Sequence, residues 1–245
     1  MRVVVTHRIA ALTAGVLLAG GTTFLASTGT ASATSPDITV SQVYGGGGNS
    51  GATLTNDFVE LFNRGTAPVT LSGWSVQYAS STGTNWRVTP LSGVLSAGAH
   101  YLVAEDAGAG GTQPLPAPDA TGSIAMSATS GKVALVTSTT ALGCGAACST
   151  AAGVRDFVGY GSANDAEGGA PAPRLSNTTA ALRAGAGGTD TDNNAADFVS
   201  GVPVPRNTAS GGGGGRSGTR IDQIQGAAHI SPDVGLTVAD VPGVV

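Results

Sequence analysis

The sequence is short of the residues from which reactive sites are usually built. Its 245 residues include two cysteines, three histidines and a single lysine, Lys132, while charged residues make up 11% and aromatic residues 4%. Glycine, by contrast, occurs 39 times. Beyond residue 33 no helical periodicity extends past two turns. This composition is typical of a loop-rich, all-β chain rather than a helical one.

The scarcity of bases and nucleophile motifs argues against catalysis. A metal-dependent phosphodiesterase centre needs several acidic, Asn and His residues on converging strands, yet only His100 and His229 lie beyond residue 33. Asp57 and Glu60, three apart on an expected strand, face opposite sides and cannot form an acid–base pair. The loop Gly45–Gly51 lacks the Gly-Lys-Ser/Thr end of a phosphate-binding loop and is interpreted as a flexible connection. We therefore expect that the chain is not an enzyme and uses no cofactor.

The first thirty-three residues have the pattern of a secretory signal peptide. Arg2 and Arg8 give a positive start, residues 9–18 form an almost uninterrupted apolar run, and Ala31-Ser32-Ala33 fits the small-residue cleavage rule. The run is short for a hydrocarbon layer of ~30 Å, so an uncleaved anchor is the weaker alternative. Cleavage would leave 245 − 33 = 212 residues with a net charge of 9 − 15 = −6. We expect a secreted, extracellular protein with no membrane segment after cleavage.

The two cysteines, Cys144 and Cys148, enclose three small residues. In an oxidising compartment such a pair predicts a local disulfide. The alternative is a metal site, but zinc takes four ligands and the two remaining histidines are distant in sequence. A loop this small stabilises the fold by roughly 2 kcal/mol in the chain-entropy model. We expect the bridge to fix a loop between strands and not to act as a redox centre.

Short apolar runs alternate with turn residues about every ten positions from Ile38 onward, which is typical of strands. The expected strands are Ile38–Tyr44, Asp57–Phe62, Val69–Tyr78, Trp86–Val88, His100–Ala104, Ser123–Met126, Lys132–Thr137 and Val154–Tyr160. The runs 123–126 and 132–137 are expected to pair as a hairpin across Ser130-Gly131. Seven or eight short strands at this spacing predict a β-sandwich.

Aromatic residues are few enough to consider singly. Trp74 is expected to fill the gap between the two sheets, with ligand stacking as the alternative. Trp86 and Tyr78 are candidates for a glycan-facing patch, although core packing is the favoured interpretation for both. His100 begins an expected strand and is expected to be half-exposed.

The character of the sequence changes near Ser200. Pro203–Asn207 closes the domain, because proline cannot donate to a central ladder. Residues 209–218 contain five consecutive glycines and are interpreted as a flexible linker with a span of roughly 17 Å. Residues 219–245 are too few to bury a core of their own. They are interpreted as the truncated start of a second β module.

The densest polar cluster runs from Asp190 to Asp197. Asp190, Asp192, Asn194 and Asp197 alternate in a way that resembles the start of a calcium loop, since Ca²⁺ takes six to eight hard oxygens. The glycine and the distal glutamate of an EF-hand loop are missing. The alternative, which we favour, is that Asp192 or Asn193 caps one short helical turn ending at Phe198. Arg183 is expected to pair with one of these carboxylates.

Together these segments resemble the lamin-tail domain, an immunoglobulin-like sandwich found in nuclear lamins and in many bacterial secreted proteins. The similarity covers about residues 36–208 and rests on Asp57–Asn63, Gly73-Trp74, Ala181-Leu182-Arg183, the acidic turn ending at Asp197-Phe198, and Pro203–Asn207. It implies an all-β, immunoglobulin-like fold in which Trp74, Arg183 and Phe198 are structural. A second cysteine pair expected near Asn164-Asp165 and Gly188-Thr189 is absent.

In bacterial proteins such a domain often precedes a secreted nuclease of the endonuclease/exonuclease/phosphatase type, and Ile221–Gly226 resembles the opening of the module that follows it. The resemblance implies a noncatalytic accessory or localising module of a truncated or split nuclease. An independent adhesion or scaffold module that binds an envelope or extracellular protein or glycan is the alternative. Nine scattered basic residues against fifteen acidic ones form no basic stripe, so direct binding to nucleic acid is not expected.

Overall fold

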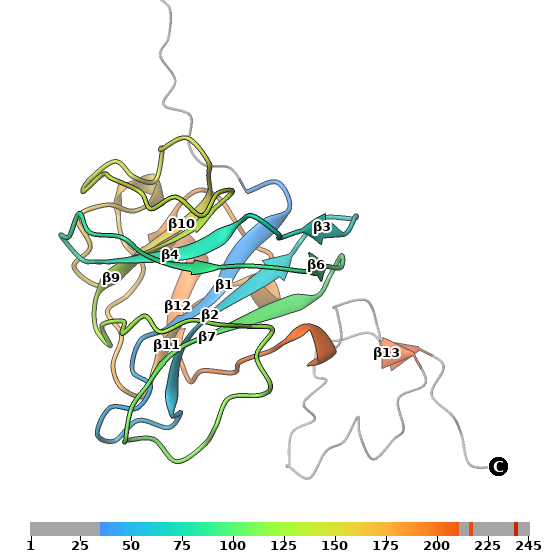
Figure 1. The fold of residues 1–245 in the computed structure, drawn as a ribbon, viewed down its shortest axis with the longest axis horizontal. Helices are drawn as coiled ribbons and strands as arrows, with labels where there is room; N and C mark the ends of the chain where they lie inside the picture. The colour runs from blue at the N-terminus through green and yellow to red at the C-terminus, as the bar shows by residue number, and fades with distance from the viewer. Residues whose placement is uncertain (1–34, 211–215, 218–237, 240–245) are drawn as a thin grey trace, which may run out of the picture. The chain divides into compact units, whose positions relative to one another are not determined.

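The computed structural model describes residues 35–210, 216–217 and 238–239, and these residues form strands with almost no helix (Figure 1). The predicted all-β, immunoglobulin-like sandwich is confirmed. The predicted signal peptide, and most of the linker and of the segment 219–245, lie outside the described residues. Among the described residues, no helix is both long and apolar enough to span a bilayer.

The larger sheet has six strands, and all neighbours are antiparallel except the last pair. In spatial order they are β12 (Phe198–Gly201), β11 (Ala180–Arg183), β1 (Ile38–Tyr44), β2 (Asn56–Asn63), β7 (His100–Ala107) and β8 (Ala120–Thr121). β1 and β2 pair from Ile38 opposite Asn63 to Tyr44 opposite Phe58, with a register shift between Val40 and Gln42. The N-terminal and C-terminal parts of the domain therefore meet within one sheet.

The smaller sheet has four antiparallel strands, in the order β10 (Val154–Tyr160), β9 (Gly131–Val136), β4 (Ser75–Ser80) and β5 (Arg87–Pro90). Two short pairs complete the strands: β3 (Val69–Thr70) with β6 (Val94–Leu95), and β13 (Arg216–Ser217) with β14 (Val238–Ala239). The helical pieces are η1 (Glu167–Gly169), η2 (Gly185–Gly187), α1 (Asn194–Asp197) and η3 (Thr208–Ser210).

The core lies between the two sheets and is built from alternate residues of the long strands. Val43 and Val59 from the larger sheet and Val76, Val133 and Leu135 from the smaller sheet are all fully buried. Each such side chain contributes about 1.5–3 kcal/mol relative to exposure. The intervening residues are buried too, because loops cover the outer faces. One outer cluster contains Tyr44, Leu54, Phe58, Leu102 and Ala180, and the other contains Ala79, Trp86, Ala134, Val136, Cys148 and Phe157.

The predicted hairpin between Ser123–Met126 and Lys132–Thr137 is wrong. The first run is not a strand; β8 ends just before it and belongs to the larger sheet, whereas β9 belongs to the smaller one. The N–H groups of Ile124 and Met126 donate instead to the carboxylates of Glu105 and Asp57, at 3.0 and 2.8 Å. The run therefore crosses from one sheet to the other with its polar backbone satisfied by side chains.

After β12 the chain crosses the outer face of the larger sheet. We call residues 202–210 the C-terminal strap (orange in Figure 1). The Val204 N–H and C=O bond to the Gln42 amide on β1, and Arg206 binds Glu60 on β2. Thr208 then reaches Asp119, whose carboxylate also accepts the Leu102 N–H of β7. Each contact lies one strand further across the sheet, so the strap leads the chain from the β12 edge to the β7–β8 side.

Candidate functional site

Arg183 on β11 is the centre of a buried group of charges that we call the Arg183 cluster, together with Asp156, Asp190 and Asp197. Its guanidinium donates to both carboxylate oxygens of Asp156, at 2.9 and 2.8 Å, and to Asp190 Oδ1 at 3.1 Å. Asp197 lies 3.6 Å away. Arginine suits this position, because its planar fork pairs with a carboxylate through two parallel hydrogen bonds.

The carboxylates of the Arg183 cluster also hold the backbone. Asp156 accepts the N–H groups of Val40, at 2.5 Å, and of its own neighbour Phe157. Asp197 accepts the N–H and hydroxyl of Thr191, at 2.8 and 2.7 Å. These bonds connect β1 and β10, which lie in different sheets, to the acidic loop. The cluster therefore fastens the two sheets and the loop together.

The acidic loop ends in a short capped helix. Asn193 precedes α1, and its side chain accepts the Ala196 N–H, as an N-cap does. The amide of Asn194 faces β10 and η1: its oxygen accepts the N–H groups of Gly159 and Glu167, and its nitrogen donates to the Phe157 carbonyl. Phe198 lies in the main core and stacks on the Arg183 guanidinium at 4.5 Å.

The structure does not gather the four predicted calcium ligands around one point. Asp190 and Asp197 meet at Arg183, but Asn194 faces the other way, and Asp192 sits at a left-handed turn with φ of 54°. The acidic oxygens that do approach one another belong to Asp156, Glu167 and Asp190, within 4.8 Å of each other. Calcium at the acidic loop therefore stays a prediction.

Glu167 differs from its neighbours in charge. Its pKa is raised to about 10, mainly by burial and then by the nearby Asp156 carboxylate, with Arg183 opposing the shift. The carboxyl is therefore neutral at pH 7. It is held by the Phe157 N–H at 3.2 Å and by the Asn194 amide at 3.1 Å. A cation at Asp156, Glu167 and Asp190 would have to ionise Glu167 and displace Arg183 from two of the three carboxylates.

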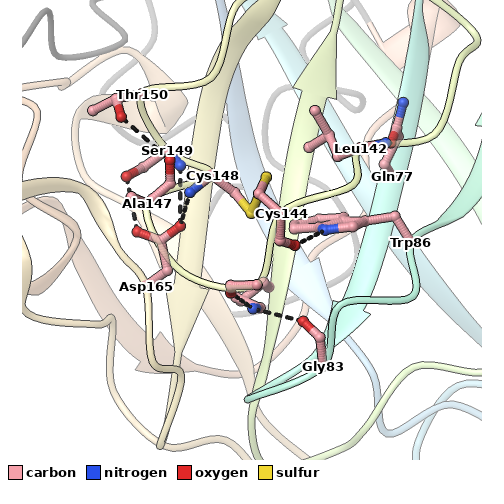
Figure 2. Close-up of a disulfide and its surroundings, with 12 residues drawn as sticks. Gln77, Gly83, Trp86, Leu142, Cys144, Ala147, Cys148, Ser149, Thr150 and Asp165 are labelled. Carbon is pink, nitrogen blue, oxygen red and sulfur yellow. Dashed lines mark hydrogen bonds between the residues drawn. A yellow bond between two sulfur atoms is a disulfide. The ribbon is translucent and has the colours of Figure 1, made fainter.

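Cys144 and Cys148 form a disulfide (Figure 2). The loop that carries it lies against the smaller sheet, where Cys148 packs with Trp86 and Phe157. The Asp165 carboxylate accepts the N–H groups of Cys148 and Ser149, at 2.5 and 3.0 Å, and the Ser149 hydroxyl. The bridge thus belongs to a loop between strands, where the sequence analysis expected it.

The aromatic residues and His100 differ in how far they are buried. Trp86 and Tyr78 are only 4% and 6% exposed, so the favoured interpretation, core packing, is confirmed for both, and the alternative of a glycan-facing patch is wrong. Trp86 lies under the disulfide loop, and Tyr78 lies in the core between the sheets. His100 is buried rather than half-exposed, against Phe62. Trp74 is only partly buried and packs at the margin of the core, with the guanidinium of Arg155 above its ring.

The glycine loop was expected to be flexible, but it packs closely. An added Cβ at Gly47 would overlap the backbone of Asn56 and Asp57, and Gly48 has φ of 67°. The Gly47 N–H donates to the Asp57 carboxylate at 2.8 Å. The loop is therefore held by the domain's own acid rather than arranged around a phosphate.

The sequence analysis did not identify Asp57 and Glu105 as carboxyl groups with shifted pKa values. Burial raises the pKa of Asp57 and of Glu105 to about 7. Both hold the segment that crosses between the sheets, through the N–H groups of Met126 and Ile124. The sequence gives no signal for this, because the groups that bury and bind these side chains are distant along the chain.

These features define an immunoglobulin-like sandwich whose buried charges connect its sheets and loops. The chain belongs to the lamin tail domain family, whose model matches residues 31–192. β12 and the C-terminal strap lie beyond the matched residues. Among solved structures, a crystal structure of a DUF4876 family protein from Bacteroides thetaiotaomicron is 13% identical, with a TM-score of 0.45 over 72% of this chain and 74% of that one. No curated protein matches the chain.

Proposed function

We propose that this chain is a noncatalytic, exported accessory module that localises a secreted nuclease at the envelope or on an extracellular polymer. The observation that carries the proposal is the use of the buried acids. Asp57, Asp156, Asp165 and Asp197 each accept backbone N–H groups from segments that they hold in place. Their hydrogen bonds to the domain's own backbone give these buried carboxylates a structural role.

Export is supported by the chemistry of the two cysteines. A disulfide persists in an oxidising compartment and is rare in the cytosol. The bridge therefore agrees with the signal-peptide pattern of residues 1–33. Sandwich folds carry many unrelated functions, so the function of this chain depends on the residues that its surface presents to a partner.

The alternative role, an adhesion or scaffold module, is favoured by an exposed apolar ridge. Val199, Val202 and Val204 are 58%, 68% and 60% exposed, and all three lie on β12 or the C-terminal strap. A row of exposed apolar side chains on one segment is a feature of protein-binding surfaces. We call these three residues the valine ridge.

Co-sedimentation with cell envelopes tests both roles. The purified exported chain is mixed with envelopes of the producing bacterium, and the bound fraction is measured by immunoblotting. We expect saturable binding. A variant with Val199→Thr, Val202→Thr and Val204→Thr loses binding if the valine ridge is the contact surface. Val94→Thr is the matched control, because Val94 is 55% exposed and lies elsewhere, on β6.

The genomic context separates the two roles. A nuclease-coding frame directly after the codon of Val245 supports the accessory role, and an unrelated gene supports the scaffold role. Envelope binding equal to that of an unrelated secreted protein would contradict both.

A further inference from the structure

The loop that carries the disulfide covers the only lysine of the chain. We call residues 142–149 the disulfide lid. Lys132 on β9 is fully buried, and its Nζ donates to three oxygens: the Gly83 carbonyl at 3.0 Å, the Asn164 side chain at 2.9 Å and the carbonyl of Gly145 in the lid. The ammonium also faces the Trp86 ring at 5.6 Å. All three N–H groups of the ammonium are therefore hydrogen-bonded within the protein.

Apart from its own bridge, the lid is held by a few hydrogen bonds and by the packing of Leu142, Cys144 and Cys148 against the cluster that contains Trp86 and Phe157. At one end the Leu142 N–H donates to the Gln77 side chain at 2.9 Å, and at the other Asp165 binds Cys148 and Ser149. In the middle, Trp86 Nε1 donates to the Cys144 carbonyl at 2.9 Å (Figure 2). The lid contributes no strand to either sheet. It can therefore detach without breaking a ladder of the sandwich.

We propose that the disulfide lid is a redox-sensitive cover: oxidised, it encloses Lys132 and Trp86, and reduced, it opens and makes the Lys132 amine a reactive site for electrophiles. A dithiol supplies two electrons and two protons to the Cys144–Cys148 bond. The products are two cysteine thiols and the disulfide of the dithiol. Attack falls on the Cys144 sulfur, because Cys144 is partly exposed whereas Cys148 is fully buried.

The bridge closes a ring of five residues, and the length of this ring determines how strongly the bridge favours the closed lid. Without the bridge, the open lid gains the conformational freedom that the ring withholds, which favours opening by about thirtyfold in the chain-entropy model. The contacts of the closed lid are the same in both states. Burial lowers the pKa of Lys132 in the closed state, and opening removes that effect. The gain in reactivity therefore comes from access of the electrophile to Nζ, which makes three hydrogen bonds while the lid is closed.

Pulsed acetylation tests the proposal. The full chain is treated with an amine-acylating reagent at neutral pH, with and without a phosphine reductant, and the acetylated fraction at Lys132 is measured by peptide mass spectrometry. We expect slow labelling of the oxidised protein and about thirtyfold faster labelling after reduction. Because Lys132 is the sole lysine, the α-amine is the only other amine of this kind in the chain, and it serves as the internal reference. Acylation of the two freed thiols is removed with hydroxylamine before the peptides are analysed.

Two variants establish the cause. A Cys144→Ser, Cys148→Ser variant should label at the fast rate with or without reductant. Asp165→Asn, which weakens one end of the lid while keeping the bridge, should raise labelling of the oxidised protein. Backbone amide exchange in β1 and β2 is followed in parallel. Equal labelling in both redox states would overturn the proposal, and so would fast labelling of the oxidised wild type. Loss of amide protection in β1 and β2 on reduction would also overturn it, because it would show global rather than local opening.

Discussion

Replacing Arg183 with alanine should destabilise the domain more than any other single change of a charged residue. The guanidinium is fully buried and satisfies Asp156 through two hydrogen bonds and Asp190 through one. Its removal leaves the buried Asp156 without a counter-charge, and leaves Asp190 with Arg64 alone, at 3.3 Å. Breaking a buried pair by deleting one partner costs about 3–5 kcal/mol, which is a large part of the stability of a domain of this size.

The assay is urea unfolding followed by tryptophan fluorescence, comparing Arg183→Ala with wild type. Arg87→Ala on β5 is the matched control, because Arg87 is exposed and surface substitutions usually change stability by less than about 0.5 kcal/mol. Arg183→Lys should recover only part of the loss, since an ammonium cannot pair with Asp156 through a planar fork. A loss below about 1 kcal/mol for Arg183→Ala would refute the reasoning, because values of that size are typical of exposed pairs.

Three further predictions follow from the other buried carboxyls. Burial raises the pKa of Asp57 and Glu105 in the folded state to about 7, so the folded protein holds more protons than the unfolded chain between about pH 4 and 7. Thermal stability should therefore fall as pH rises through this range, and Asp57→Asn should flatten the dependence; a rise would contradict the shifts. Arg206→Ala should cost about 2 kcal/mol in urea unfolding, because Glu60 loses a charged donor; no loss would show that the strap is not fastened there. Millimolar Ca²⁺ should not raise the melting temperature, since Asn194 faces away from Asp190; a rise would restore the calcium site.

The strands that the sequence predicts best are those whose pattern is local. Ile38–Tyr44 largely alternates between apolar and polar residues, and Asp57–Phe62 is a short apolar-rich run that ends at turn residues. Both are strands in the structure with nearly the same bounds. The prediction failed at Ser123–Met126, which has a strand-like composition. Its N–H groups bind acids that lie far away in the sequence, and no local pattern reveals such partners.

The candidate site was predictable to the extent that it depends on residue type. A lone pair of cysteines and an acidic turn beside an arginine point to a bridge and to ion pairs. The exposure of His100 was predicted wrongly, because a loop covers the outer face of the sheet there and the His100 ring meets the Ala186 carbonyl. Whether a loop lies on a strand depends on long-range contacts, which alternation along the strand does not encode.

If the buried acids of this domain maintain its structure and perform no chemistry, the purified chain should not cleave nucleic acid. The chain is incubated with double-stranded DNA, single-stranded DNA and RNA in the presence of Mg²⁺ or Ca²⁺, and hydrolysis is measured. We expect turnover no greater than that of buffer. Hydrolysis that copurifies with the chain and is abolished by Asp156→Asn in a folded variant would contradict it.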